Sequence, residues 1–170
     1  NIPVLEVEVD DWDRIFAINV RGTMLPVQAF AQRWIDRGIK GSIVNLSSGA
    51  ATSARAGGAG YNGSKAAVSM MTEVMAIEFG PHGIRVNAVA PGLVMDEVWE
   101  RDSGVDLHPY AELMLRGTPL GRTGHPDDIA EAVTFLASSK ASPWTTGSIL
   151  KVTGGSHCGR THMPLSRNMR

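Results

Sequence analysis

The sequence Ser42-Ile43-Val44-Asn45-Leu46-Ser47 predicts a short buried strand, and the neighbouring elements can be placed outward from it. A loop of small residues follows, and the next pattern predicts a helix from about Tyr61 to Phe79 that Gly80-Pro81 ends. Ile84 to Ala90 predict the next strand, which Pro91-Gly92 terminates. Two strands joined by a helix favour a parallel pair with a right-handed crossover.

The pattern continues on both sides of this unit. Residues 10–37 predict one long helix, because acidic residues charge its start and apolar residues follow at helical spacing, and Pro26 inside it predicts a kink. Residues 93–118 predict a long loop with one or two short helices. Pro126 opens a third helix that reaches about Ser138, and Ser148 to Val152 predict the last strand.

This alternation of helices and strands indicates the α/β class. Three strands make a thin sheet, whereas buried parallel strands normally have neighbours on both sides. The pattern therefore suggests that further strands belong to the same sheet. We expect one domain over residues 1–155, followed by a polar and loose tail over residues 156–170.

The composition argues against several classes of partner. The chain has 170 residues, of which 43% are hydrophobic, and a net charge of -1 without a basic stripe, so nucleic acid is not expected. Apolar runs are too short for a membrane span. The single cysteine, Cys158, fits a reducing compartment, and we expect a cytoplasmic protein. The chain begins at Asn1, which suggests a piece of a longer protein and leaves an upstream targeting peptide open.

Tyr61 and Lys65 lie four residues apart at the head of the second predicted helix, so both side chains are expected on one face. A phenol is a poor base at neutral pH. A nearby ammonium favours the phenolate, and proton exchange with an alcohol or carbonyl becomes feasible. Taken alone, this spacing more often marks a pair on the protein surface.

Two further polar residues accompany this pair. Ser48 follows the first predicted strand, thirteen residues before Tyr61, where open α/β sheets bind ligands. Asn19 lies in the middle of a predicted helix among apolar neighbours, where an amide needs hydrogen-bond partners. The Asn19 side chain is either satisfied by backbone in the core or part of the same site.

Taken together, these residues resemble the short-chain dehydrogenase/reductase family. The resemblance runs from about residue 3 to residue 159 and rests on segments in the family's order and spacing. These segments are Asn19-Val20-Arg21-Gly22, Gly41 to Ser48, Tyr61 to Ala67, Ile84 to Gly92, Gly121-Arg122 with Pro126 to Ala130, and Gly154-Gly155. The resemblance implies a partial Rossmann-type, doubly wound parallel sheet that contains the last three strands and their flanking helices.

The resemblance also implies a role for each polar residue. Tyr61 would be the acid/base, and Lys65 would make proton loss from the phenol easier and bond the nicotinamide ribose. Ser48 would hold the substrate oxygen, with Ser47 as the rival for this role. Asn19 would order a water in the proton relay.

The implied cofactor is NAD or NADP, and the implied substrate is a small alcohol or carbonyl compound. Pro91, Gly92 and Val94 would line the nicotinamide, and the Val94 backbone would meet its carboxamide. Trp99 is a candidate substrate-binding residue in an apolar lid. Its other members are Leu107, Tyr110, Leu113 and Met114, although ordinary packing explains this group equally well.

Two departures from the family pattern matter. The chain has Met95-Asp96 where the family usually has a threonine that contacts pyrophosphate, and a carboxylate there would repel phosphate unless it points away. The family also begins with a strand, a glycine-rich turn and two more strands, none of which this sequence contains. The residues that discriminate NAD from NADP belong to that segment. We therefore expect catalytic residues without the segment that holds the cofactor's phosphates.

Three other motifs point to competing functions. Gly58, Gly60 and Gly63 spell a dinucleotide fingerprint, but that fingerprint requires its first glycine directly after a strand, so we expect a flexible loop instead. His157, Cys158 and His162 lack a fourth ligand and an ordering element, which argues against a metal site. No serine lies in a G-x-S-x-G segment, so a hydrolase of the α/β type is not indicated.

A second functional hypothesis is that the chain is a catalytically incomplete remnant or an assembly subunit. Members of the family usually form dimers or tetramers through their two long helices and final strand. The sequence predicts these elements here, so the resemblance implies a homo-oligomer.

Overall fold

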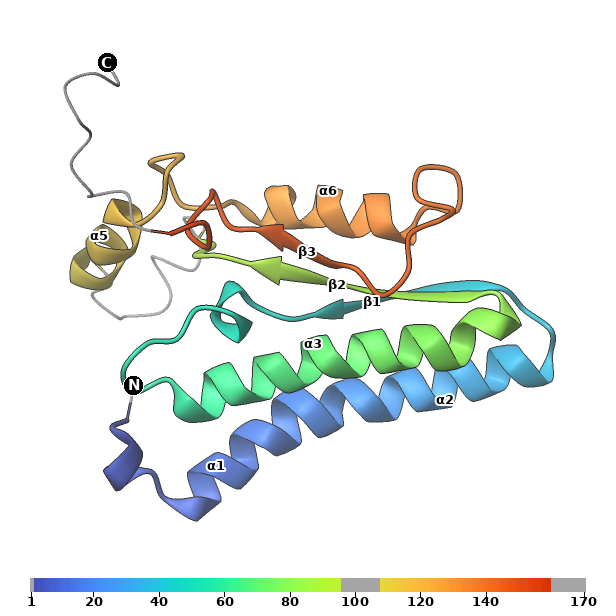
Figure 1. Ribbon diagram of the computed structural model, residues 1–170, viewed down its shortest axis with the longest axis horizontal. Coiled ribbons are helices and arrows are strands. Elements are labelled where there is room, and N and C mark those ends of the chain that lie inside the picture. Colours follow the sequence, from blue (N-terminus) through green and yellow to red (C-terminus); the bar gives the residue numbers. More distant parts are fainter. Residues whose placement is uncertain (1, 96–107, 160–170) are drawn as a thin grey trace.

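The sheet is the centre of the fold in this computed structural model, which describes residues 2–95 and 108–159 (Figure 1). Its parallel strands are β1 (Gly41–Leu46), β2 (Ile84–Pro91) and β3 (Ile149–Val152), in the order β1-β2-β3. Gly41 pairs with Ile84 at one end of the β1–β2 ladder. The expected α/β architecture with a three-stranded parallel sheet is confirmed.

Helices cover both faces of the sheet (Figure 1). On one face lie α1 (Val9–Phe16), a π-helical turn (Ala17–Arg21), α2 (Gly22–Asp36) and α3 (Ala59–Phe79). On the other face lies α6 (Pro126–Ala137), while α5 (His108–Arg116) lies beyond the carboxyl ends of the strands. Short 3-10 turns occupy Val4–Glu6, Gly49–Ala51 and Gly80–His82.

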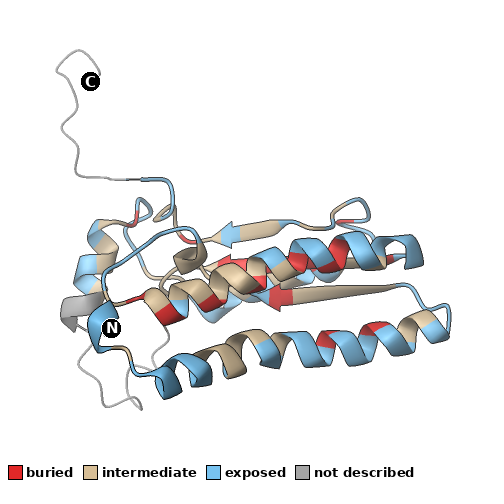
Figure 2. Cartoon of the chain, turned by 60° about the horizontal axis from the view of Figure 1, so that its bottom comes forward, coloured by how far each residue is buried: buried red, intermediate tan, exposed pale blue. Residues whose placement is uncertain are grey.

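The core forms where α3 packs on β2 (Figure 2). Val86, Ala88 and Val89 of β2 are fully buried, because this central strand has neighbours on both edges and helices on both faces. Val68 on α3 is also fully buried, and Val27 of α2 joins the same core. This packing fixes the position of the α3 N-terminus relative to the carboxyl ends of β1 and β2.

The predicted long helix over residues 10–37 is interrupted, but not at the expected place. Pro26 lies inside α2, whereas the helix widens at Ala17–Arg21, where the Gly22 N–H donates to the Ala17 carbonyl five residues back. The Thr23 hydroxyl donates to the Asn19 carbonyl at 2.8 Å within this region. Single π-helical turns inside α-helices are frequent at functional sites.

Polar side chains fix α6 and β3 to the central strand. The Arg85 guanidinium donates to the Leu136 carbonyl at 2.9 Å and to the Ala137 carbonyl at 3.3 Å, which satisfies the C-terminal end of α6. The fully buried Asn87 donates to the Thr145 carbonyl and accepts from the Ser148 N–H. These bonds align the strands, so that their carboxyl ends meet at one end of the sheet.

The outer edge of β1 differs from the rest of the sheet. No strand pairs with it among the residues that the structure describes. A groove runs between this edge and α2, with Phe30 and Leu46 on its walls, and these two side chains are 58% and 55% exposed. In the described part of the chain, none of the helices has the length and apolar character that a membrane crossing needs.

Candidate active site

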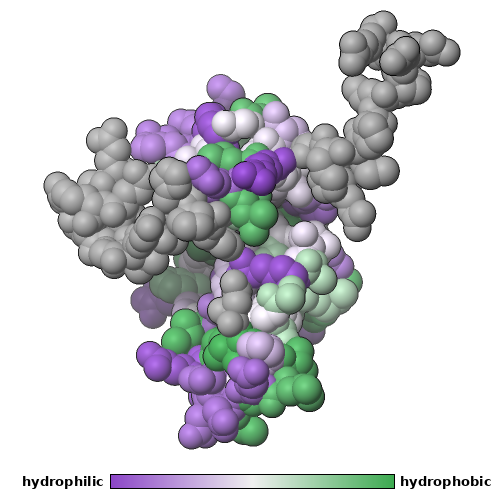
Figure 3. All heavy atoms as spheres, turned by 90° about the vertical axis from the view of Figure 1, so that its left-hand side faces the viewer, coloured by the Kyte–Doolittle hydropathy of each residue, from purple (hydrophilic) through white to green (hydrophobic). Residues whose placement is uncertain are grey.

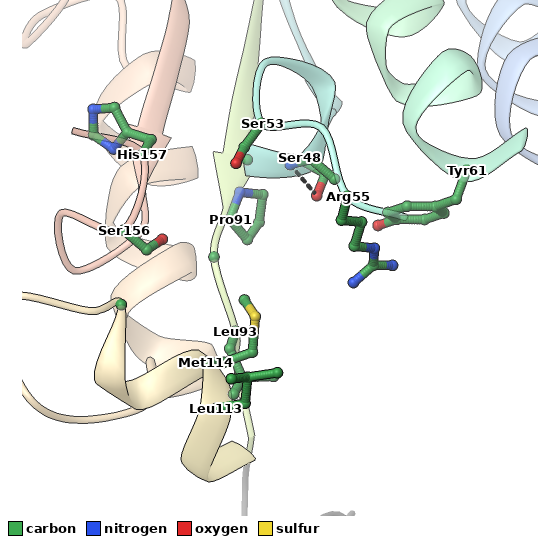
Figure 4. A pocket seen from close by; sticks show the side chains of 14 residues that line it. Ser48, Ser53, Arg55, Tyr61, Pro91, Leu93, Leu113, Met114, Ser156 and His157 are labelled. Carbon is green, nitrogen blue, oxygen red and sulfur yellow. Dashed lines mark hydrogen bonds between the residues drawn. The ribbon is translucent and has the colours of Figure 1, made fainter. Parts of the chain in front are cut away.

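A pocket opens at the carboxyl ends of the strands, between the start of α3 and the loops that follow β2 and β3 (Figure 4). Its volume is about 340 Å³. Ligands of open α/β sheets bind at this end of the strands. The residues that line the pocket are Ser48, Gly49, Ala50, Ser53, Arg55, Tyr61, Pro91, Gly92, Leu93, Leu113, Met114, Gly117, Ser156 and His157.

Tyr61 lies in the first turn of α3 and presents its ring to this pocket. Its exposure is 37%, so the phenol can meet a bound molecule while its backbone stays in the helix. The Lys65 Nζ lies 5.9 Å from the centre of the ring, and the Arg55 Cζ lies 5.8 Å from it. Two cationic side chains therefore lie beside the Tyr61 ring.

Lys65 follows one turn later on the same face of α3. Its Nζ donates a hydrogen bond of 3.0 Å to the Leu46 carbonyl at the end of β1. Burial lowers the pKa of the Lys65 ammonium, since a charged group loses hydration there. An ammonium has three donors, so Lys65 can bond a further acceptor while it keeps the Leu46 carbonyl.

The structure separates the two serines that follow β1. Ser47 is only 2% exposed. Its hydroxyl donates to the Lys65 carbonyl at 3.1 Å and shares a hydrogen bond of 2.7 Å with the Ser69 hydroxyl. Ser48 lines the pocket, and its hydroxyl accepts a hydrogen bond from the Ala50 N–H (Figure 4). Geometry therefore brings Ser48 and Tyr61 to one cavity and places Ser47 beneath α3.

Asn19 lies in the π-helical turn and faces α3. Its side-chain amide donates to the Ser64 hydroxyl at 2.9 Å, and this hydroxyl donates to the Tyr61 carbonyl at 2.8 Å. Ser64, which lies between Tyr61 and Lys65 in the sequence, is fully buried. The Asn19 side chain is thus satisfied by another side chain, and it fixes the helical turn that carries the Tyr61–Lys65 pair.

Comparison with known proteins places this arrangement in a family. A family model described as enoyl-(acyl carrier protein) reductase, one of those for the short-chain dehydrogenase/reductases, matches residues 1–157. This chain belongs to the short-chain dehydrogenase/reductase family. The resemblance drawn from the sequence motifs is therefore confirmed.

Curated relatives of this short-chain dehydrogenase/reductase are longer than the chain itself. The (3R)-3-hydroxyacyl-CoA dehydrogenase of Canis lupus familiaris is 40% identical over 152 residues, which are 89% of this chain and 57% of that protein. The L-xylulose reductase of Homo sapiens is 41% identical over 153 residues, which are 90% of this chain and 62% of that protein. The chain thus spans about three fifths of the length of these relatives.

Solved structures share the fold of this short-chain dehydrogenase/reductase over nearly all of its length. A 4-hydroxyisoleucine dehydrogenase mutant complexed with NADH and succinate has a TM-score of 0.84 and 32% identity, covering 94% of this chain and 65% of that chain. A short-chain type dehydrogenase/reductase from Mycobacterium marinum has a TM-score of 0.82 and 35% identity, covering 92% of this chain and 60% of that chain.

The residues after β2 line the pocket in part. Pro91, the last residue of β2, contributes to its wall, as do Gly92 and Leu93. Gly92 lies close to Thr153, the residue that follows β3. A Cβ at Gly92 would lie 2.9 Å from the Thr153 Cα. Val94 forms an isolated parallel bridge with Gly124 and is not among the pocket-lining residues.

The expectation of a flexible loop at Gly58, Gly60 and Gly63 was wrong. Gly58 is the N-cap of α3, and Gly60 and Gly63 lie inside this helix. Added Cβ atoms would lie 3.2 Å from Ile15 at Gly60 and 3.7 Å from Phe16 at Gly63. Gly60 lets α1 approach α3 closely, and this packing outweighs its low helix propensity, whereas a Cβ at Gly63 would make only an ordinary contact.

Part of the expected lid can be located. Leu113 and Met114 line the pocket from α5, which also contains Tyr110. Trp99, the candidate substrate-binding residue, and Leu107 lie outside the described residues, as does Asp96.

Sequence reasoning missed several residues of the pocket wall, among them Ser53, Arg55 and His157. The His157 Nδ1 lies 2.6 Å from the Thr153 hydroxyl, in a turn where the Cys158 N–H donates to the Gly155 carbonyl. The start of the tail that we expected to be loose thus forms a turn. Within the described residues, no group of three potential metal ligands is present, and His162 lies outside them.

Proposed function

We propose that this chain carries the proton-transfer site of an NAD- or NADP-dependent oxidoreductase that interconverts an alcohol and a carbonyl. One observation carries the proposal: Ser48 and Tyr61 line one pocket, with the Lys65 ammonium 5.9 Å from the centre of the Tyr61 ring. Membership of the short-chain dehydrogenase/reductase family and the oxidoreductase relatives support it.

The residues present fit the nicotinamide end of such a cofactor. Lys65 has donor capacity beyond its bond to Leu46, which suits ribose hydroxyls, while Pro91, Gly92 and Leu93 offer an apolar wall beside it. The nicotinamide supplies or accepts the hydride when it is bound. Solved neighbours are complexed with NADH or with NADP, and both cofactors stay in the proposal.

The protein's own residues would handle the proton. Ser48 donates a hydrogen bond to the substrate oxygen and holds it near the Tyr61 hydroxyl. Tyr61 gives its proton to that oxygen during carbonyl reduction and takes it back during alcohol oxidation. Lys65 stabilises the phenolate that exists between these events. Asn19, through Ser64, holds the helical turn between Tyr61 and Lys65, and a water ordered near Asn19 would complete the proton relay.

The substrate class follows from the lining of the pocket. A cavity of about 340 Å³ with Leu93, Leu113 and Met114 on one side suits a small alcohol or carbonyl compound with an apolar portion. Trp99, which lies outside the described residues, stays in the proposal as a substrate-binding residue on the basis of the sequence alone. The intact protein is further proposed to be a cytoplasmic homo-oligomer that assembles through its long helices and last strand.

A second candidate function is that of a catalytically incomplete remnant or assembly subunit, and the outer edge of β1 favours it. This edge is unpaired within the described residues, and an apolar groove lies beside it. A chain with this edge open is expected to self-associate. A chain without the glycine-rich turn that holds the pyrophosphate is expected to bind the cofactor weakly. Calorimetric titration with NADH and NADPH decides between the two, because micromolar binding to a soluble monomer would contradict this alternative.

The main proposal is tested with the protein that is expressed from the natural reading frame encoding these residues. Purified protein is assayed with NAD and NADP against a panel of small alcohols, and with the reduced cofactors against the corresponding carbonyl compounds. Turnover that Tyr61→Phe abolishes without changing the unfolding temperature supports the proposal. Equal turnover by the wild type and the Tyr61→Phe variant overturns it.

A further inference from the structure

The segment Leu93–Met95 leaves the sheet immediately after the pocket-lining Pro91 and Gly92. Within residues 2–95 and 108–159, its backbone hydrogen bonds to another loop go to one residue: the Gly124 N–H donates to the Leu93 carbonyl at 2.8 Å, and the Met95 N–H donates to the Gly124 carbonyl at 3.0 Å. These two bonds form the isolated parallel bridge between Val94 and Gly124. The position of this wall of the pocket therefore depends on where Gly124 lies.

Gly124 packs closely against this segment. A Cβ at Gly124 would lie 3.2 Å from the Val94 side chain and 3.5 Å from the Leu93 carbonyl oxygen. Its φ is not positive, so a left-handed conformation is not the reason for glycine here, and the space for a side chain is limited by the Val94 side chain instead. What holds the loop around Gly124 consequently sets the distance between the two segments.

An ion pair holds both neighbours of Gly124. The Arg122 guanidinium binds the Asp128 carboxylate through two contacts of 2.7 Å and 3.0 Å, and it also donates to the Thr123 carbonyl at 2.9 Å. The same carboxylate accepts the His125 N–H at 2.8 Å. We call this arrangement the Arg122–Asp128 clamp.

The clamp contributes more to local position than to overall stability. Its side chains are 58% and 33% exposed, and exposed ion pairs generally add little to the free energy of unfolding. The two hydrogen bonds between the planar groups do, however, fix the orientation of the Arg122 guanidinium relative to the Asp128 carboxylate. Hydrogen bonds from Arg122 and from the His125 backbone hold the pKa of Asp128 far below its usual range, so the carboxylate is charged and the clamp complete at neutral pH.

From these contacts we infer that Arg122 and Asp128 are positioning residues for the nicotinamide-binding wall. Asp128 fixes Arg122 and His125, these two residues fix Gly124, and Gly124 fixes the backbone from Leu93 to Met95. The inference rests on the proposed function for the claim that this wall meets a nicotinamide. The mechanical link between the clamp and the wall stands on the contacts alone.

Hydrogen exchange of the chain tests the mechanical link without any assay of activity. Asp128→Asn removes the charge and one half of the paired contact with little change in shape. The Met95 and Gly124 N–H groups should then exchange at least about fivefold faster, because their hydrogen bonds open more often. Asp128→Glu should restore slow exchange, and Arg122→Gln should reproduce the effect of Asp128→Asn.

Asp127→Asn is the matched control. It removes the same charge from the same turn of α6, but Asp127 is 86% exposed and faces the His125 ring at 3.3 Å rather than Arg122. Exchange at Met95 and Gly124 should change by less than about twofold in this variant, as for most surface substitutions. Equal acceleration in both variants, or unchanged exchange in Asp128→Asn, overturns the inference.

The link to the cofactor has a separate readout. In the catalytically active protein, Asp128→Asn should raise the KM for the nicotinamide cofactor several-fold while kcat changes less than about twofold, because the proton-transfer groups lie on another wall. Faster exchange with an unchanged cofactor KM would overturn the role toward nicotinamide and leave the mechanical link standing. Absence of any oxidoreductase activity would count against the proposed function but would not alter the exchange result.

Discussion

The two sides of the pocket are built differently. Ser48 and Tyr61 come from the end of β1 and the start of α3, elements that pack on the buried core, whereas Leu93, Leu113 and Met114 come from segments outside the sheet (Figure 4). We call the first side the scaffold wall and the second the loop wall. Figure 3 looks onto this end of the molecule, where hydrophobic surface gathers mainly in the lower half.

The anchors of the two walls differ as well. The scaffold wall is fixed by largely buried hydrogen bonds of Ser47 and Ser64, while the loop wall is fixed by backbone bonds to Gly124 and by an exposed ion pair. Proton transfer depends on distances that a scaffold must hold, and recognition tolerates more adjustment. We therefore expect substitutions in the scaffold wall to change turnover and those in the loop wall to change apparent affinity.

The largest effect is expected for Tyr61→Phe. This change removes the proton donor and leaves the ring in place, so turnover should fall by about 10²–10⁴-fold while the substrate KM changes little. Steady-state kinetics on the natural protein measures both quantities. A kcat within tenfold of the wild type would remove Tyr61 from the mechanism and end the distinction between the walls.

Lys65→Met should have the next largest effect. In the proposed mechanism Lys65 stabilises the phenolate, so the loss of the ammonium should move the pH at which alcohol oxidation is fastest upward. The pKa of Lys65 is lowered by burial, so its charge destabilises the fold at neutral pH, and this cost fades as the pH rises toward the ordinary lysine value. The free energy of unfolding of the Lys65→Met variant should therefore rise less between neutral and alkaline pH than that of the wild type. An unchanged pH–rate profile would contradict the role proposed for Lys65.

The two serines provide an internal comparison within the scaffold wall. Ser48→Ala removes a donor to the developing charge on the substrate oxygen, and turnover should fall by about 10²-fold with normal stability. Ser47→Ala removes a buried hydroxyl that bonds Lys65 and Ser69, so it should lower the free energy of unfolding by about 1 kcal/mol with a smaller effect on turnover. Denaturant titration and kinetics on both variants separate the roles. The reverse result would restore Ser47 as the candidate.

The scaffold wall was accessible to sequence reasoning because its chemistry follows local spacing. Tyr61 and Lys65 lie one helical turn apart, and Ser48 directly follows a strand that the apolar run predicts. Local pattern also predicted the strands and most helix ends within a few residues. It did not separate Ser47 from Ser48, since the two serines are adjacent at the end of the same strand and only the packing of α3 distinguishes a buried from a pocket-facing hydroxyl.

Features that depend on tertiary contacts were out of reach. The sequence placed Gly60 in the loop before a helix that begins at about Tyr61, and only the approach of α1 explains why Gly60 lies inside α3. Pro26 suggested the break in the long helix, yet the π-helical turn forms around Asn19, whose partner Ser64 is 45 residues away. Arg55 and His157 follow no pattern that marks a pocket wall.

The smallest effect is expected on the loop wall, at Leu113. This side chain is 67% exposed and lines the pocket from α5, so truncation to alanine should leave folding unchanged and remove only apolar contact with the substrate. The lost contact is worth about 1 kcal/mol, which predicts a rise of about fivefold in the substrate KM and a turnover close to that of the wild type.

Leu120→Ala is the matched control for this last prediction. Leu120 is 70% exposed and lies outside the pocket that Ser48 and Tyr61 line, so the same truncation there should leave both kinetic constants unchanged. Because Leu113 lines the pocket from α5 rather than from β1 or α3, a selective rise in KM would locate substrate recognition on the loop wall. A fall in kcat for Leu113→Ala equal to that of Ser48→Ala would mean that α5 also orients the reacting groups, and the two walls would then act as one.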